Sequence, residues 1–153
     1  MVTTAARELP QANEPEHIAR ALRLADVFAG RAAAHDRDAS FPFENFADLS
    51  REGLLALTVP AALGGSGAGA RDATRVLGII GKADPSTALV LSMHYIQHLV
   101  MARSTRWPAR LSRKLAKETV EGVALINALR VEPDLGTPLR GGLPATTARR
   151  SGD

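Results

Sequence analysis

Between Asp84 and Arg103 the sequence predicts a helix that neighbouring helices have to surround. Asp84 supplies a side chain that caps helices, and Pro85 fits the first helical position, where its missing donor is harmless. The apolar residues that follow fall on every side of a helix: Leu89, Val90, Leu91, Met93, Tyr95, Ile96, Leu99, Val100 and Met101. Because a helix that is apolar all round is a buried one, we expect a mainly α domain with this helix at its centre.

Four more segments have the three- and four-residue spacing of amphipathic helices, so a five-helix bundle is expected. They cover residues 14–35, 42–53, 71–83 and 108–121. The inward residues of the last one are predicted to be Leu111, Leu115 and Val120. We expect the helical domain to span residues 14–122 and residues 1–13 to be flexible.

The glycine cluster "GGSGAG", Gly64–Gly69, lies in the connection between the second and third helices. It invites comparison with a phosphate-binding loop. The dinucleotide fingerprint requires a third glycine where Ala70 stands, and no lysine of the Walker type follows. We therefore interpret the cluster as a structural turn.

The sequence changes character after Gly122. Apolar residues now alternate roughly as in a strand: Val123, Leu125, Leu129 and Val131. Prolines and glycines then crowd residues 133–144, which the interior of a helix does not tolerate. Because a lone strand leaves its backbone groups unpaired, we expect residues 123–153 to be the start of a β domain that is incomplete at Asp153.

The composition narrows the classes of function. The 153 residues carry a formal net charge of +3 and no cysteine, which excludes disulfides, thiolate zinc sites and cysteine nucleophiles. Basic residues are interspersed with acidic ones and aromatic residues make up 4% of the chain, which argues against nucleic-acid binding. The N-terminus lacks the apolar run of a secretory signal, and no segment reaches the roughly 20 apolar residues of a membrane span. No membrane association and a cytoplasmic location are the default expectations.

Two features could carry chemistry. His94 and His98 stand four residues apart, hence on one face of the central helix. Two histidines do not hold a zinc ion and no third ligand stands nearby in the sequence, so we expect no metal, and both the lining of a pocket and a structural role stay open. In "EPDLGTP" a rigid turn leaves the backbone donors of Gly136 and Thr137 free, an arrangement that can hold a phosphate.

Three stretches resemble the N-terminal part of the acyl-CoA dehydrogenase family: "FPFENFADLSREGLLALTVPAALGGSGAG", "ADPSTALV" and "VEPDLGT". The last is similar to the Thr-Glu-Pro-x-x-Gly-Ser motif that opens the family's β domain. The resemblance covers about residues 22–153. Because the family consists of a helical domain, a β domain and a second helical domain, it implies a five-helix bundle followed by the entrance to a flavin-binding sheet.

The resemblance also implies FAD as cofactor and assigns its contacts. Residues along the isoalloxazine ring would be Ala128, Leu129, Arg130 and Val131, and those at the flavin pyrophosphate or the substrate would be Gly136 and Thr137. Thr137, His94 and His98 would border the substrate, an acyl-CoA or another small molecule. The family's catalytic base comes from the second helical domain, so no catalytic residue is expected in this chain. The full-length protein is expected to be a homo-oligomer.

Two positions depart from the family pattern. Val131 stands where the family usually has a threonine that hydrogen-bonds the flavin, and Pro138 replaces the usual aspartate. The resemblance thus allows a portion of an acyl-CoA dehydrogenase, or a portion of a flavin-dependent monooxygenase of the same fold. The latter uses reduced FAD or FMN and oxygen on a sulfur or nitrogen compound. A catalytically inactive fragment is the third interpretation, and the 153-residue chain alone is expected to be inactive.

Overall fold

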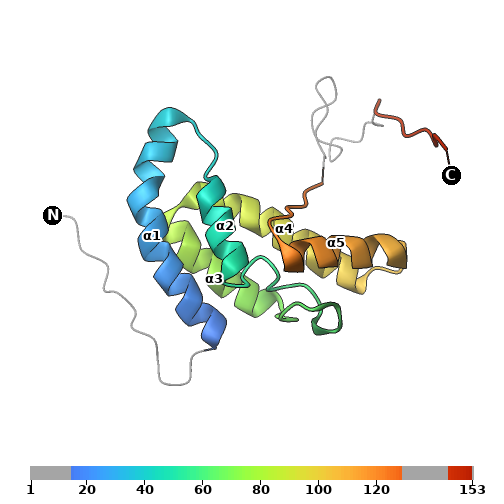
Figure 1. The fold of residues 1–153 in the computed structure, drawn as a ribbon, viewed down its shortest axis with the longest axis horizontal. Coiled ribbons are helices and arrows are strands. Elements are labelled where there is room, and N and C mark those ends of the chain that lie inside the picture. The colour runs from blue at the N-terminus through green and yellow to red at the C-terminus, as the bar shows by residue number, and fades with distance from the viewer. Residues whose placement is uncertain (1–14, 129–144, 153) are drawn as a thin grey trace.

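A computed structural model describes residues 15–128 and 145–152 of the chain. Within these ranges it contains one short 3-10 helix, η1, and five α-helices (Figure 1). Their bounds are α1 (Glu16–Asp38), α2 (Phe43–Arg51), η1 (Ala61–Leu63), α3 (Ala70–Ala83), α4 (Pro85–Arg103) and α5 (Ala109–Glu121). The mainly α fold and its five expected helices are confirmed, whereas residues 1–13, expected to be flexible, lie outside the described ranges.

Helix α3 packs against both α1 and α4, and α5 lies beside α4 (Figure 1). One apolar cluster joins α1 to α4 with the loop after α2: Ile18, Ala21, Leu24, Phe28, Phe46, Leu49, Leu54, Leu55, Leu57, Ala73, Val76, Ile80, Leu91 and Tyr95. Burying one large apolar side chain stabilises a fold by about 1.5–3 kcal/mol. This cluster therefore determines how the first four α-helices are placed.

Local capping explains where α4 begins and where α2 ends. The carboxylate of Asp84 accepts hydrogen bonds from the backbone nitrogens of Ser86 at 3.0 Å and Thr87 at 3.2 Å. Pro85 occupies the first helical position, as expected. Gly53, with a φ of 70°, provides the left-handed residue after α2.

Helix α1 differs slightly from its predicted bounds. It begins at Glu16, after Pro15, and continues to Asp38, past the expected end at His35. His35 and Arg37 both lie in its last turn, where positive charge is favourable beside the free carbonyl groups of a helix.

The glycine cluster forms a structural turn, as interpreted from the sequence. At Gly65 an added Cβ would lie 2.3 Å from the carbonyl oxygen of Val59, so no other residue fits without a backbone shift. Three consecutive backbone N–H groups, those of residues 66–68, donate to carbonyl oxygens within the same connection. Because these donors already have partners, they do not form a phosphate cradle.

A buried polar network joins α1, α2 and α4. Arg31 donates to the side-chain oxygen of Asn45 at 2.9 Å and to the carboxylate of Asp48 at 2.8 Å. The amide nitrogen of Asn45 donates in turn to Asp84 and to the hydroxyl of Thr87, each at 3.1 Å. Buried polar groups with partners cost little, so this network adds specificity to the apolar packing. None of its long-range pairs was predicted from the sequence.

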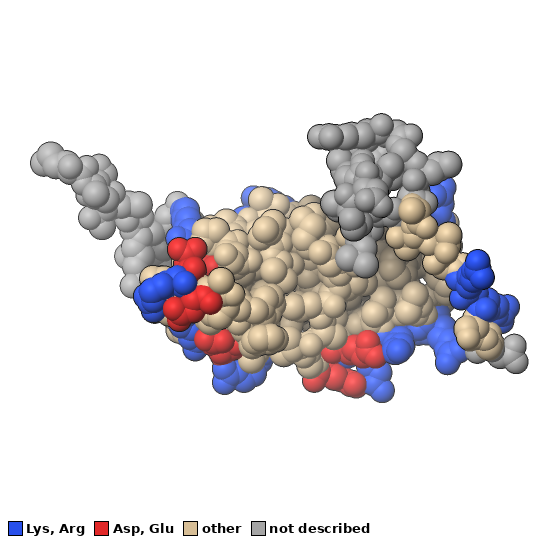
Figure 2. All heavy atoms as spheres, turned by 90° about the horizontal axis from the view of Figure 1, so that it is seen from above, with Lys and Arg blue, Asp and Glu red and all other residues tan. Residues whose placement is uncertain are grey.

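Helix α4 is buried on one side only, which corrects the expectation of burial all round. Leu89 is 63% exposed, Val100 47% and Ile96 44%. Within the described residues, α3 and α5 pack against the other side of this helix. Figure 2 shows a face of the molecule on which Lys, Arg, Asp and Glu gather at the ends and edges and leave the middle to other residues.

The buried face of α5 also differs from the predicted one. Ala116 and Thr119 are buried, whereas Leu111 is 39% and Val120 38% exposed. Thr119 has a hydrogen-bonding partner on α4, described below, and both buried side chains are small. Thr119 therefore faces α4, whereas Ala116 packs against Ala56 and Val59 in the connection after α2.

Residues 123–128, expected to begin a strand, adopt no regular secondary structure. A strand is defined by hydrogen bonds to a second strand, and the described residues contain no strand. The assignment of residues 123–153 to a β domain accordingly stays a prediction.

Candidate functional site

A cavity of about 380 Å³ lies between α4 and the segment that follows α5. The described residues that line it are apolar except for one amide side chain: Leu89, Val90, Met93, Leu125, Ile126 and Asn127. Small-molecule sites are typically concave and mostly apolar, with a few polar groups that orient the ligand. The cavity also adjoins the exposed side of α4, to which Leu89 belongs, so it is the candidate functional site.

His94 holds the segment after α5 against α4. Its side chain is completely buried. Nε2 lies 3.1 Å from the carbonyl oxygen of Leu55, to which it can only donate. Nδ1 is therefore unprotonated and accepts a hydrogen bond from the backbone nitrogen of Ile126 at 3.3 Å. One neutral imidazole thus connects the loop after α2 with a residue that lines the cavity.

His98 acts on the same segment through Thr119. The hydroxyl of Thr119 donates to the carbonyl oxygen of Ala124 at 3.2 Å. Its oxygen is then free to accept from Nε2 of His98, which lies 3.2 Å away. The rings of His94 and His98 meet edge to face with their centroids 4.6 Å apart, so the two contacts form one buried cluster.

Burial keeps both histidines neutral. Desolvation lowers the pKa of His94 to about 4, with a smaller contribution from the neighbouring His98. Desolvation also lowers the pKa of His98. At neutral pH both rings therefore carry one proton, which is the state that the hydrogen bonds require.

The structure brings some of the predicted site residues together. His94 and His98 are buried and hydrogen-bonded, and His94 bonds the cavity residue Ile126, but neither histidine lines the cavity; Ala128 does not line it either. The remaining predicted residues lie outside the described ranges: Leu129, Arg130, Val131, Gly136 and Thr137. Sequence reasoning missed Thr119 and Asn127. The position of a polar residue in the sequence does not show which buried group it will contact in the folded chain.

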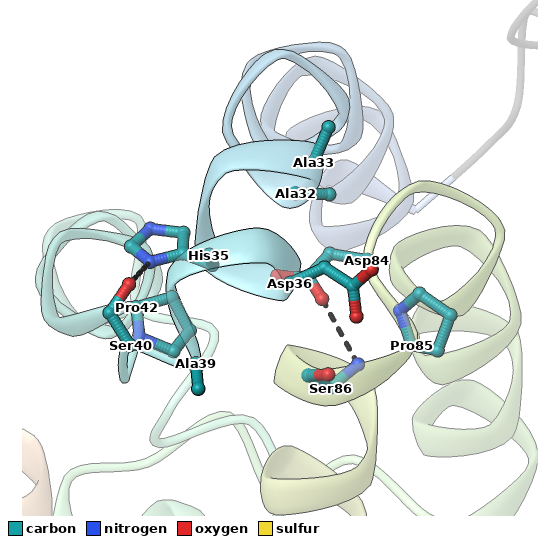
Figure 3. A pocket seen from close by; sticks show the side chains of 10 residues that line it. All are labelled: Ala32, Ala33, His35, Asp36, Ala39, Ser40, Pro42, Asp84, Pro85 and Ser86. Atoms are coloured by element: carbon teal, nitrogen blue, oxygen red, sulfur yellow. Dashed lines mark hydrogen bonds between the residues drawn. The ribbon is translucent and has the colours of Figure 1, made fainter.

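Two other hollows lie away from residues 123–128. One of about 710 Å³ is found where the end of α1 meets the start of α4 (Figure 3). There His35 bonds Ser40 at 2.8 Å, and Asp84 caps α4 through Ser86. The other, of about 310 Å³, is bordered by His98 and Trp107. In the first hollow these polar side chains are engaged in local contacts, which makes it a weaker candidate than the cavity on α4.

The described residues contain neither a candidate metal site nor a helix that could span a membrane. They contain no group of three or more histidine, aspartate or glutamate side chains arranged to hold a metal ion. None of the helices in this part of the chain has the length and apolar character required to cross a membrane.

The described residues thus form a helical domain with an apolar cavity beside α4 as its candidate site. A family model described as the N-terminal domain of acyl-CoA dehydrogenases matches residues 16–117. The chain belongs to the acyl-CoA dehydrogenase family, a family of oxidoreductases.

Curated relatives include both dehydrogenase and nitrososynthase names. YdbM of Bacillus subtilis strain 168, named as an acyl-CoA dehydrogenase, is 34% identical over 126 residues, covering 82% of this chain and 33% of the relative. The amino sugar nitrososynthase RubN8 of Streptomyces rubradiris is 35% identical over 95 residues, 61% of this chain and 22% of the relative. An L-evernosamine nitrososynthase of a Micromonospora species is 32% identical over 129 residues, 76% and 31% of the two chains. The chain thus spans a third or less of the length of these relatives.

A solved structure has a similar fold. KijD3, crystallised in complex with dTDP, aligns with a TM-score of 0.66 and 31% identity over 74% of this chain and 31% of that protein.

Proposed function

We propose that this chain is the N-terminal part of an FAD-dependent oxidoreductase that dehydrogenates an acyl-CoA thioester between its α and β carbons. The observation that carries the proposal is the apolar cavity between α4 and residues 125–127 in a chain of this family. The domain would supply one wall of the site. The family's catalytic base lies in its second helical domain, so we assign no catalytic residue here and expect the 153 residues alone to be inactive.

The cavity suits a flat, largely uncharged ring system. None of the described residues that line it is Lys, Arg, Asp or Glu, and Asn127 provides the polar group. Residues 128–131 would continue along the isoalloxazine, and Gly136 with Thr137 would contact the pyrophosphate or the substrate, as the family resemblance implies. Flavin, when bound, supplies the acceptor for the hydride that leaves the β carbon.

The described residues would contribute binding and exclusion of water. Leu89 and Met93 offer apolar surface to an acyl chain, and a site lined in this way strengthens the electrostatic interactions made inside it. His94 and His98 would support the substrate side from behind. For the whole protein we further propose an acyl-CoA as the partner molecule, a homo-oligomeric assembly and a cytoplasmic location.

A second candidate function is oxidation of a nitrogen compound by flavin and oxygen. It is favoured by the two nitrososynthase relatives and by KijD3, which binds dTDP. In that case the substrate would be an amino sugar linked to a nucleotide, and FMN could replace FAD. A catalytically inactive fragment is the third interpretation.

The proposal is tested by two matched variants in the chain expressed with the coding sequence that follows Asp153 in its gene. Leu89→Asp places a carboxylate in the cavity wall, whereas Val27→Asp changes an exposed apolar residue of α1. We expect Leu89→Asp to lower the flavin content or substrate affinity by about tenfold or more, because a bound ligand would cover the carboxylate and burying a charge is costly, and Val27→Asp to have no effect. Equal effects of both variants, or no flavin in the parent protein, would overturn the proposal.

A further inference from the structure

The segment after α5 is held at two backbone positions that are two residues apart. The carbonyl oxygen of Ala124 accepts from Thr119, and the backbone nitrogen of Ile126 donates to His94. In an extended chain, backbone groups two residues apart point to the same edge. Both contacts therefore reach one edge of the segment.

We infer that His94, together with the pair His98 and Thr119, positions residues 124–126 by taking the place of a neighbouring strand along this edge. We call this cluster the histidine clamp. The purpose of the clamp rests on the proposed function. In that function the segment leads from the helical domain into the residues that would lie along the flavin. His94 and His98 are thus positioning residues rather than catalytic ones.

The opposite edge of the segment has no partner among the described residues. The backbone groups of Leu125 and Asn127 form no hydrogen bond with any residue of the described ranges, and both side chains line the cavity. An edge with free donors and acceptors accepts either a strand or the polar rim of a planar ligand. The clamp would therefore orient the free edge while leaving it available.

The donor and acceptor pattern makes the clamp depend on one tautomer. His94 donates from Nε2 to Leu55 and accepts at Nδ1 from Ile126. Of the described titratable side chains, those of His98 and Tyr95 make ring contacts with His94. An added proton on Nδ1 would place two donors face to face and release Ile126.

Two substitutions of His94 separate its two contacts. In His94→Asn the side-chain oxygen stands near the former Nδ1 and can still accept from Ile126, whereas in His94→Gln the amide nitrogen stands near the former Nε2 and can still donate to Leu55. Thr119→Ser keeps the hydroxyl that bonds Ala124, and Thr119→Val removes it at similar size.

The test is amide hydrogen exchange of residues 123–128 in the 153-residue chain, measured by NMR together with the urea midpoint of each variant. We expect His94→Gln and Thr119→Val to raise the exchange rate of this segment about tenfold, and His94→Asn and Thr119→Ser to stay near the parent rate. If exchange merely follows the urea midpoint in all four variants, or does not change, the clamp is disproved.

This measurement requires no flavin, so it distinguishes failure of the clamp from failure of the proposed function. Faster exchange in His94→Gln would support the clamp even if the full-length protein binds no flavin. If His94→Gln does not fold, the two Thr119 variants provide the test. Equal exchange rates of residues 123–128 in Thr119→Val and Thr119→Ser would overturn the inference.

Discussion

Asn45 on α2 and Asp84 at the start of α4 meet across 39 positions of the sequence, with the amide nitrogen 3.1 Å from the carboxylate. Both side chains are buried, and Asp84 also caps α4. One carboxylate oxygen of Asp84, Oδ1, therefore caps α4, while the other, Oδ2, ties the start of this helix to α2.

Asn45→Leu should destabilise the chain by about 3 kcal/mol. It removes two hydrogen bonds that involve a charged group, the one donated to Asp84 and the one accepted from Arg31, and bonds of this kind contribute about 1.5–3 kcal/mol each. Urea unfolding followed by circular dichroism measures the loss. Asn127→Ala, at an exposed position, is the control and should change stability by less than about 0.5 kcal/mol. Similar losses in both variants would contradict a special role of the network.

Acid should weaken the fold through His94. Its pKa falls from 6.5 to about 4 on folding, so the unfolded chain binds the proton first and stability is lost as the pH falls from about 6.5 to about 4. The loss attributable to this residue is on the order of 3 kcal/mol. His98 contributes in the same direction, because burial lowers its pKa as well.

The measurement is the urea midpoint as a function of pH in the parent chain and in His94→Asn. The variant cannot take up this proton, so its stability should decline less over the same window. Parallel curves for the two proteins would show that His94 is not the group responsible.

Gly65→Ala should cost about 2 kcal/mol or more, because the new Cβ would lie 2.3 Å from the carbonyl oxygen of Val59 and the connection would have to shift. Gly78→Ala is the matched control inside α3, where an added Cβ meets nothing within 4 Å. It should stabilise the chain by about 0.5–1 kcal/mol, since alanine is the better helix former. Thermal unfolding of both variants checks the prediction, which fails if they shift in the same direction.

The exposed side of α4 should make the isolated chain self-associate. Leu89, Ile96 and Val100 present apolar surface there, and contiguous apolar patches favour association. Sedimentation velocity should show species larger than the monomer at high concentration. Ile96→Lys should return the chain to a monomer, whereas Val27→Lys on α1 should not. A parent chain that is monomeric at all concentrations would contradict this.

The sequence was sufficient to place the helices because their ends depend on local chemistry. Asp84 followed by Pro85 marks the start of α4, and Gly53 marks the end of α2. These residue types act through local geometry and need no tertiary partner. The side of a helix that is buried depends instead on its neighbours. The apolar circumference of α4 did not show which side would stay exposed, and Thr119 rather than Leu111 faces α4 because His98 provides a partner.

The candidate site was predictable only in part for the same reason. The spacing of His94 and His98 placed them correctly on one face of a helix, but their contacts with Leu55 and Thr119 join segments far apart in the sequence. No pattern in the neighbouring sequence indicates a hydrogen bond to such a distant residue. The strand expected after Gly122 likewise depends on a second strand, and none is present among the described residues.

The most direct test of the account is to isolate the protein from its own cells with an antibody raised against these 153 residues and to record its absorption spectrum. The account predicts a flavin spectrum that is bleached by an acyl-CoA in the absence of air. Bleaching by a reducing cofactor and reoxidation coupled to an amino sugar nucleotide would favour the second candidate function. A colourless protein that binds neither FAD nor FMN would contradict the central claim.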